Sequence, residues 1–252
     1  MILNLYKNLF FIKYIMSLIL QDNDIIKILS KKKNESNIDS LITKIINTFT
    51  LTKNLLSPLS NGKLKGYEKS KFGIINPLLW EFGHIINFWT EKTINFLKYD
   101  SIKLNNEYLF DSHQVDKETR FEITKNNQIE SFKRMLEIYD SIIASIVDSL
   151  VSLRFNNPNL DSVTSYLINL SLLHNEMHNE SFCFSLQSLG LCKPKVYDNI
   201  NKLFDETKNC INKKTENTFI KIKGDTFNQG WEDTEDNFTF DNERPQFKVS
   251  IK

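Results

Sequence analysis

Residues 161–190 read DSVTSYLINLSLLHNEMHNESFCFSLQSLG. The stretch has no Pro and no Gly before Gly190, and its apolar residues recur at helical spacing, so it predicts one long helix. Gly190 is a good place for this helix to end, because glycine readily adopts the left-handed conformation that closes a helix. The spacing also predicts an inward-facing apolar stripe that contains both histidines of the stretch, together with Leu167, Leu170, Met177 and Ser181.

Three more helices are predicted upstream of this stretch. The first begins at Ser36 and stops before Pro58, since a proline disfavours helical backbone at the residue before it. The second covers residues 77–98 and is rich in aromatic residues, and the third extends from about residue 129 to the break at Asn156. Residues 58–76 and 99–124 are predicted to be crossovers or site-lining loops. Four long amphipathic segments indicate a mainly α protein built on a four-helix bundle.

The end of the chain has a different pattern. Residues 219–222 and 247–251 alternate apolar and polar side chains, which is typical of β-strands. Two or three strands cannot bury a core of their own. We therefore expect them either to pack on the bundle or to begin a further domain. The resulting domain prediction is an extension and linker at 1–35, a bundle at 36–195 and a β-type segment at 210–252.

The first twenty residues, MILNLYKNLFFIKYIMSLIL, are apolar but interrupted by Lys7 and Lys13. No small-residue cleavage site follows, which disfavours a cleaved signal peptide. A segment of about 20 apolar residues is long enough for a membrane anchor. An amphipathic first helix, or an extension upstream of a start at Met16, is favoured over both.

Composition restricts the class of protein. The chain has 252 residues, of which 40% are hydrophobic and 25% charged, which is ordinary for a soluble globular protein. A net charge of +1 gives no electrostatic footprint for nucleic acid. Three cysteines cannot form a closed disulfide set, so we expect a reduced, cytoplasmic protein.

The clearest chemical signal is the pair His174 and His178. Side chains at positions i and i+4 of a helix lie on one face, so two imidazoles at this spacing can bind one metal ion. His84 lies on the second aromatic-rich helix, where burial without a partner would be costly. Three inward-facing histidines on two helices make a neutral site that leaves coordination positions open. The alternative for His84 is a core histidine bonded to a backbone carbonyl.

Other residues are weaker candidates. Glu81 and Glu180 either orient an imidazole from behind or simply face solvent. Arg120 is a candidate for binding an anionic substrate. His113 is predicted to lie on a surface loop, and Cys183 to be buried in the bundle. The sequence has neither a Gly-rich phosphate loop nor a Ser-His-Asp order, and no catalytic residue is assigned.

Five segments resemble one family in the same order. Asn76–His84 (NPLLWEFGH) is similar to the first ligand helix of the ergothioneine-type sulfoxide synthases, and Leu173–Glu180 (LHNEMHNE) to their HxxxHxE helix. Tyr108–Ser112 (YLFDS) resembles the segment between them. Ile222–Gly230 and Phe240–Pro245 resemble the opening and the FDNE-x-P signature of a sulfatase-modifying-factor, formylglycine-generating-enzyme-like domain of the α+β class.

The resemblance implies a DinB-like bundle followed by the incomplete beginning of that second domain. It implies a non-haem iron(II) enzyme (cofactor Fe²⁺) with His84, His174 and His178 as ligands. The implied partners are dioxygen, a small thiol and a trimethylated histidine, which are joined through a C–S bond and oxidised to a sulfoxide.

Two departures from the family pattern affect the substrate and the reaction. Met177 stands where ergothioneine-making members often have a Gln that helps to bind the betaine, and Met resembles the selenoneine-type branch, which uses a selenium donor. The family's catalytic tyrosine lies beyond residue 252, so we expect the isolated chain to bind iron without forming the C–S bond, and a partner chain to supply the missing half. Two other functions stay open: a DinB-like metal-dependent thiol transferase that uses zinc, and a non-catalytic metal-binding remnant of a split gene.

Overall fold

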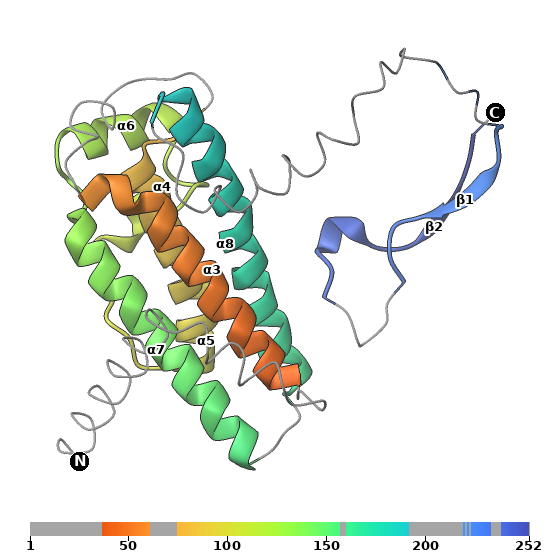
Figure 1. Cartoon of the computed structure of the whole chain (residues 1–252), viewed down its shortest axis with the longest axis horizontal. Coiled ribbons are helices and arrows are strands. Elements are labelled where there is room, and N and C mark those ends of the chain that lie inside the picture. Colours follow the sequence, from red (N-terminus) through yellow and green to blue (C-terminus); the bar gives the residue numbers. More distant parts are fainter. Residues whose placement is uncertain are drawn as a thin grey trace, which may run out of the picture. The chain divides into compact units, whose positions relative to one another are not determined.

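The computed structural model describes residues 37–60, 75–156, 160–191, 219, 221, 223–232 and 238–251. The chain divides into two compact units, Met1–Gly190 and Leu191–Lys252. The end of the bundle predicted at residue 195 lies outside the described residues. The described residues are mainly helical, which confirms the mainly α class predicted from the sequence (Figure 1). The predictions for residues 1–20 lie outside the described residues.

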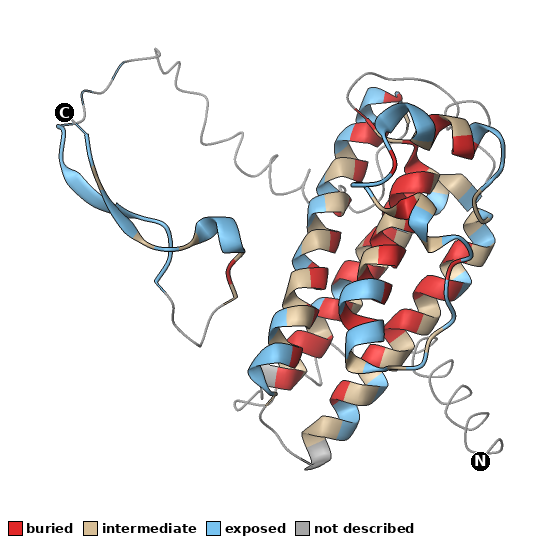
Figure 2. Ribbon diagram, turned by 180° about the vertical axis from the view of Figure 1, so that it is seen from behind, coloured by how far each residue is buried: buried red, intermediate tan, exposed pale blue. Residues whose placement is uncertain are grey.

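Four long helices of the described residues lie side by side in the first unit (Figure 1): α3 (Asn37–Ser60), α4 (Leu78–Trp89), α7 (Phe132–Asn156) and α8 (Ser162–Ser188). Helix α3 is parallel to α8, because Thr48 and Thr52 bond to Glu176 and Asn179 in the same order. Helix α4 is antiparallel to α8, as the pairs Trp89–Asn175 and Thr93–Ser171 show. Figure 2 shows buried residues along the facing sides of the helices. No described helix combines the length and the apolar character needed to cross a membrane.

Aromatic side chains form the centre of the bundle. The phenol ring of Tyr139 stacks on Phe49 with centroids 4.0 Å apart and meets the edge of Phe82 at 5.2 Å. Such ring pairs are favourable beyond the area that they bury. The largest fully buried side chains are Trp80, Trp89, Tyr139, Phe49, Phe82, Phe110 and Phe182. Three of the seven come from α4.

The ends of the first two predicted helices can be compared with the structure. The prediction that the first helix stops before Pro58 is wrong, because α3 continues to Ser60. Proline there removes one hydrogen bond from the last turn, while the fully buried Leu55 and Leu56 keep that turn packed. The second helix does reach residue 97, through a π-helical turn at Thr90–Ile94 and the short α5 (Asn95–Leu97).

The region 99–124 is more ordered than the predicted loop. It contains the 3-10 helix η3 (Glu107–Phe110) and the helix α6 (Lys117–Lys125). Asp116 caps α6, since its side chain accepts a hydrogen bond from the Thr119 amide at 2.9 Å. A cap of this kind stabilises a short helix that has little apolar pattern.

The predicted inward stripe of α8 is wrong in one respect. Met177 is 58% exposed and does not face the interior. The buried face of α8 lies to one side of the predicted stripe and consists of Thr164, Ile168, Ser171, Leu172, Asn175, Asn179, Phe182, Ser185 and Leu186. Five of these nine residues are polar, which explains why apolar spacing alone misplaced the face. The helix ends as predicted, with Gly190 at φ +66°.

The second unit has one small antiparallel sheet among its described residues. Strands β1 (Thr226–Gln229) and β2 (Phe247–Ser250) pair so that Phe227 lies opposite Val249. Phe219 and Lys221 are not in a strand, and the rest of the strand predicted at 219–222 lies outside the described residues. A side chain at Gly230 (φ +90°) would place its Cβ 2.7 Å from the Pro245 carbonyl oxygen, so glycine is required there.

Candidate metal centre

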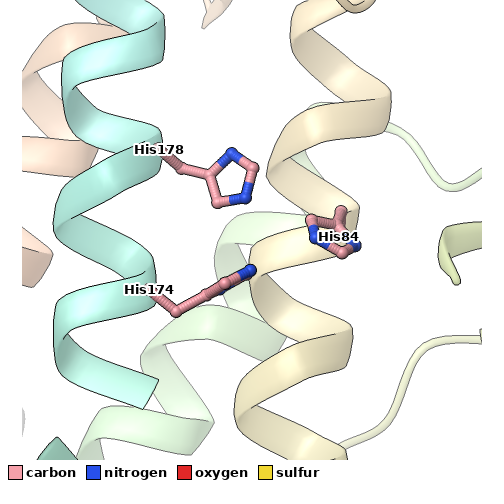
Figure 3. A group of neighbouring side chains, drawn as sticks. All are labelled: His84, His174 and His178. Carbon is pink, nitrogen blue, oxygen red and sulfur yellow. The ribbon is translucent and has the colours of Figure 1, made fainter. Parts of the chain in front are cut away.

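Three imidazoles converge between α4 and α8. His84 comes from α4, and His174 and His178 come from successive turns of α8 (Figure 3). One ring nitrogen from each residue lies within 4.8 Å of the other two. The three ring centroids are 4.6 to 5.1 Å apart, and each pair of rings meets edge to face. The structure thus brings together the three residues that the sequence suggested as ligands.

A backbone carbonyl orients His84. Its Nδ1–H donates to the Phe110 carbonyl oxygen at 2.8 Å, and one turn earlier Trp80 Nε1–H donates to the Leu109 carbonyl oxygen at 2.7 Å. Gly83 makes this docking possible, because a Cβ there would lie 2.1 Å from the Phe110 ring. The η3 segment is thereby attached to α4. With Nδ1 as the donor, His84 keeps its Nε2 lone pair for a ligand.

A buried carboxylate orients His178. Its Nδ1–H donates to Glu81 Oε1 at 2.7 Å, and Glu81 is 0% exposed. A carboxylate behind a metal-binding histidine fixes the tautomer and makes the other ring nitrogen a better ligand. Glu81 Oε2 has no hydrogen-bond partner among the described residues. Glu180 is exposed, so of the two predicted carboxylates only Glu81 contacts a histidine.

His174 is supported differently. Its buried Nδ1 has no hydrogen-bond partner among the described residues. The ring instead stacks on Phe88, with centroids 3.7 Å apart and planes within 11°. The side chain is therefore held by packing alone.

Burial keeps two of the imidazoles neutral. It lowers the pKa of His174 to about 2, and the neighbouring His178 and His84 lower it further in the same direction. Burial also lowers the pKa of His84 to about 4, against the opposing effect of its bond to the Phe110 carbonyl. Metal ligands must be unprotonated, so both rings can bind a cation at neutral pH without losing a proton first.

The donor set fits a divalent transition metal. Imidazole nitrogen suits zinc, iron, copper and nickel, whereas magnesium and calcium prefer oxygen ligands. Three protein ligands leave positions for other molecules. The unpartnered Nδ1 of His174 and the carboxylate behind His178 are both consistent with a site completed by a cation.

The other predicted site residues lie around this centre without joining it. Arg120 packs over the Trp80 ring at 4.2 Å and donates to the carbonyl oxygens of Val115 and Ser112 and to Asn76 Oδ1, each at 3.0 Å. It therefore links the loop after η3 to α4.

His113 is exposed, as predicted, whereas Cys183 is half-buried rather than buried.

Sequence reasoning offered Glu81 as a supporting carboxylate but missed the Phe110 carbonyl group that supports His84. The carbonyl groups of Leu109 and Phe110 have no side-chain signature. One sequence signal was available. Trp80 and His84 lie one helical turn apart, both carry a ring N–H that can donate a hydrogen bond, and Gly83 between them leaves room for another chain segment to approach.

Comparison with known proteins adds no family assignment. No protein-family model matches the chain. A search of curated proteins likewise finds no match.

Proposed function

We propose that the first unit is the metal-binding module of an iron(II)- and dioxygen-dependent enzyme that forms C–S bonds, of the sulfoxide synthase type. One observation carries the proposal: three histidine nitrogens from two helices lie within 4.8 Å of one another. The order of the resembling segments along the sequence supports the finer assignment to a DinB-like bundle of this enzyme type. His84, His174 and His178 would hold the iron.

When bound, iron(II) would supply dioxygen activation and a binding position for the thiol sulfur. The chain's own residues determine the geometry. Phe110 and Glu81 hold the Nδ1 protons of His84 and His178, so that both rings present Nε2. Neutral imidazoles leave a divalent cation its full charge, which favours an anionic thiolate as the next ligand.

The proposed substrates are a small thiol and a trimethylated histidine, with a selenium donor as the variant that Met177 suggests. Arg120 and Met177 remain candidates for substrate contact. The three cysteines fit a reduced, cytoplasmic setting.

The test is anaerobic loading of the chain with iron(II), followed by nitric oxide as a stand-in for dioxygen. We expect one iron per chain and the EPR signal of an iron–nitrosyl complex. Adding a thiol such as cysteine should shift that signal, because sulfur occupies another open position. His178→Ala is the matched negative control. Iron bound equally by both proteins would contradict the proposal.

A zinc-dependent thiol transferase is the second candidate. All three ligands and Glu81 belong to the first unit, so a metal site can form there without the second. Zinc binds most nitrogen sites more tightly than iron(II) does, so the two functions are separated by assaying the iron(II)-loaded and zinc-loaded proteins separately. Thiol activation by the zinc form, together with no nitrosyl signal from the iron(II) form, would favour the transferase.

A further inference from the structure

Asn175 connects α8 to the three other helices of the bundle. Its Oδ1 accepts hydrogen bonds from Tyr139 Oη of α7 at 2.6 Å and from Trp89 Nε1 of α4 at 3.1 Å. Its Nδ2 donates to Thr52 Oγ1 of α3 at 3.0 Å. The residue is fully buried. One side chain therefore has a hydrogen-bond partner on each neighbouring helix.

The network continues along α8. Thr52 Oγ1 also donates to Asn179 Oδ1 at 2.7 Å, and Asn179 Nδ2 donates to Glu176 Oε2 at 3.3 Å. Glu176 in turn accepts a hydrogen bond from Thr48. Buried polar groups are costly without partners, so such a network permits few rotations of the helix that carries it. Burial also raises the pKa of the Tyr139 phenol, so it remains a donor.

Each asparagine directly follows a ligand histidine. Successive residues of a helix are 100° apart, so Asn175 and Asn179 face the core while His174 and His178 face α4. A rotation or a shift of α8 that broke the asparagine bonds would move both histidines with it. Metal–nitrogen distances near 2.0–2.1 Å tolerate little such displacement.

We propose that Asn175 is a positioning residue for the metal centre, one that sets the rotation of α8 against α3, α4 and α7 so that His174 and His178 meet His84. This inference rests on the proposed function. It assigns to Asn175 a role in metal affinity and coordination geometry in addition to its role in stability. The Trp89 bond is the most direct part of the link, because Trp89 lies on the same helix as His84.

The experiment compares cobalt(II) binding by the full chain and its variants, with the visible spectrum of the bound ion as a report on coordination geometry. Asn175→Ala removes all three bonds, and we expect at least about a tenfold loss of affinity and a changed spectrum, as for other groups behind metal ligands. Tyr139→Phe removes the contacts of the phenol oxygen with Asn175 Oδ1 and Thr52 Oγ1 and keeps the ring packed. We expect a smaller loss from it, and it decides the question if Asn175→Ala does not fold.

The matched control is Thr93→Val. Thr93, in the π-helical turn that follows α4, forms another buried hydrogen bond to α8, with Ser171 Oγ at 2.9 Å, and this bond is not part of the Asn175 network. A purely structural role predicts that Thr93→Val and Tyr139→Phe change cobalt affinity equally for equal losses in chemical stability. A positioning role predicts that only the variants in the Asn175 network change the cobalt affinity and the spectrum of the bound ion.

The outcomes are distinct. Wild-type affinity and spectrum in folded Asn175→Ala and Tyr139→Phe would overturn this inference alone. Failure of the wild-type chain to bind cobalt would overturn the proposed function and this inference with it.

Discussion

The α4 and α8 sides of the metal centre hold their ligands by different means. We call a histidine braced when its Nδ1–H donates a hydrogen bond to a protein acceptor. His84 on α4 is braced by the Phe110 carbonyl, and Glu81 on the same helix braces His178 of α8. On α8, His174 has neither brace and depends on ring stacking with Phe88. A ligand whose proton is fixed by a partner is already oriented before the metal arrives, whereas a ligand held by packing must be ordered on binding. The three histidines therefore differ in how well they are oriented before a metal ion binds.

The largest expected effect comes from removing a braced ligand. His84→Ala and His178→Ala should each lose stoichiometric binding of cobalt(II) or iron(II), a loss of more than about 100-fold in affinity. His174→Ala should bind about tenfold more tightly than either, because two oriented ligands remain and orientation from behind contributes about that factor. Titration of metal-free protein with cobalt measures all three. Equal losses in the three variants would show that bracing does not distinguish the ligands.

The next largest effect concerns the brace itself. Glu81→Gln keeps the shape of the side chain but allows an amide N–H to face His178, which would move the ring proton from Nδ1 to Nε2 and block the ligand atom. We expect metal affinity to fall by about 10- to 100-fold. Glu180→Gln is the matched control, since Glu180 is an exposed carboxylate on α8. A similar loss in both variants would point to a general charge effect instead.

The third effect is the pH dependence of the metal-free protein. The pKa of His84 is lowered to about 4 and that of His174 to about 2, both from 6.5. Below pH 6.5 the unfolded chain therefore binds protons that the folded chain does not, and stability falls as the pH decreases toward these values. The slope is at most about 1.4 kcal/mol per pH unit for each histidine.

Urea unfolding in the presence of a chelator, between pH 7 and 4.5, measures this slope. The double variant His84→Gln/His174→Gln should show a flatter profile over the same range. An unchanged profile in the double variant would mean that other groups cause the pH dependence.

The mainly helical class and the spacing of the ligands followed from the sequence because both depend on local periodicity. His174 and His178 share a face at any helix rotation, and His84 lies on the most apolar helix. Of the supporting groups, Glu81 was already a candidate from the sequence. The Phe110 carbonyl was not, because a carbonyl group has no sequence signature and the fold brings it to His84 from 26 residues away.

The face of α8 that packs in the core could not be predicted from the sequence either. Its core face carries Ser171, Asn175 and Asn179, all buried. These polar residues are stabilised by partners on other helices, which a single helical pattern cannot show. Apolar periodicity therefore pointed to Met177. Helix α6 was missed for a related reason, since it is short and polar, although Asp116 and Thr119 have the spacing of a cap.

The smallest expected effect tests this corrected orientation. Met177 is 58% exposed, whereas Leu172 on the same helix is 4% exposed. Met177→Gln should change the free energy of unfolding by no more than about 0.5 kcal/mol, as is usual for surface positions. Leu172→Ala, the matched buried position, should cost about 2–5 kcal/mol because it leaves a cavity in the core. Chemical denaturation of the metal-free chain compares the two. If Met177→Gln were as destabilising as Leu172→Ala, the face of α8 predicted from apolar spacing would be the buried one. A small effect would agree with the exposed position of Met177, where the side chain can change at little cost to the fold.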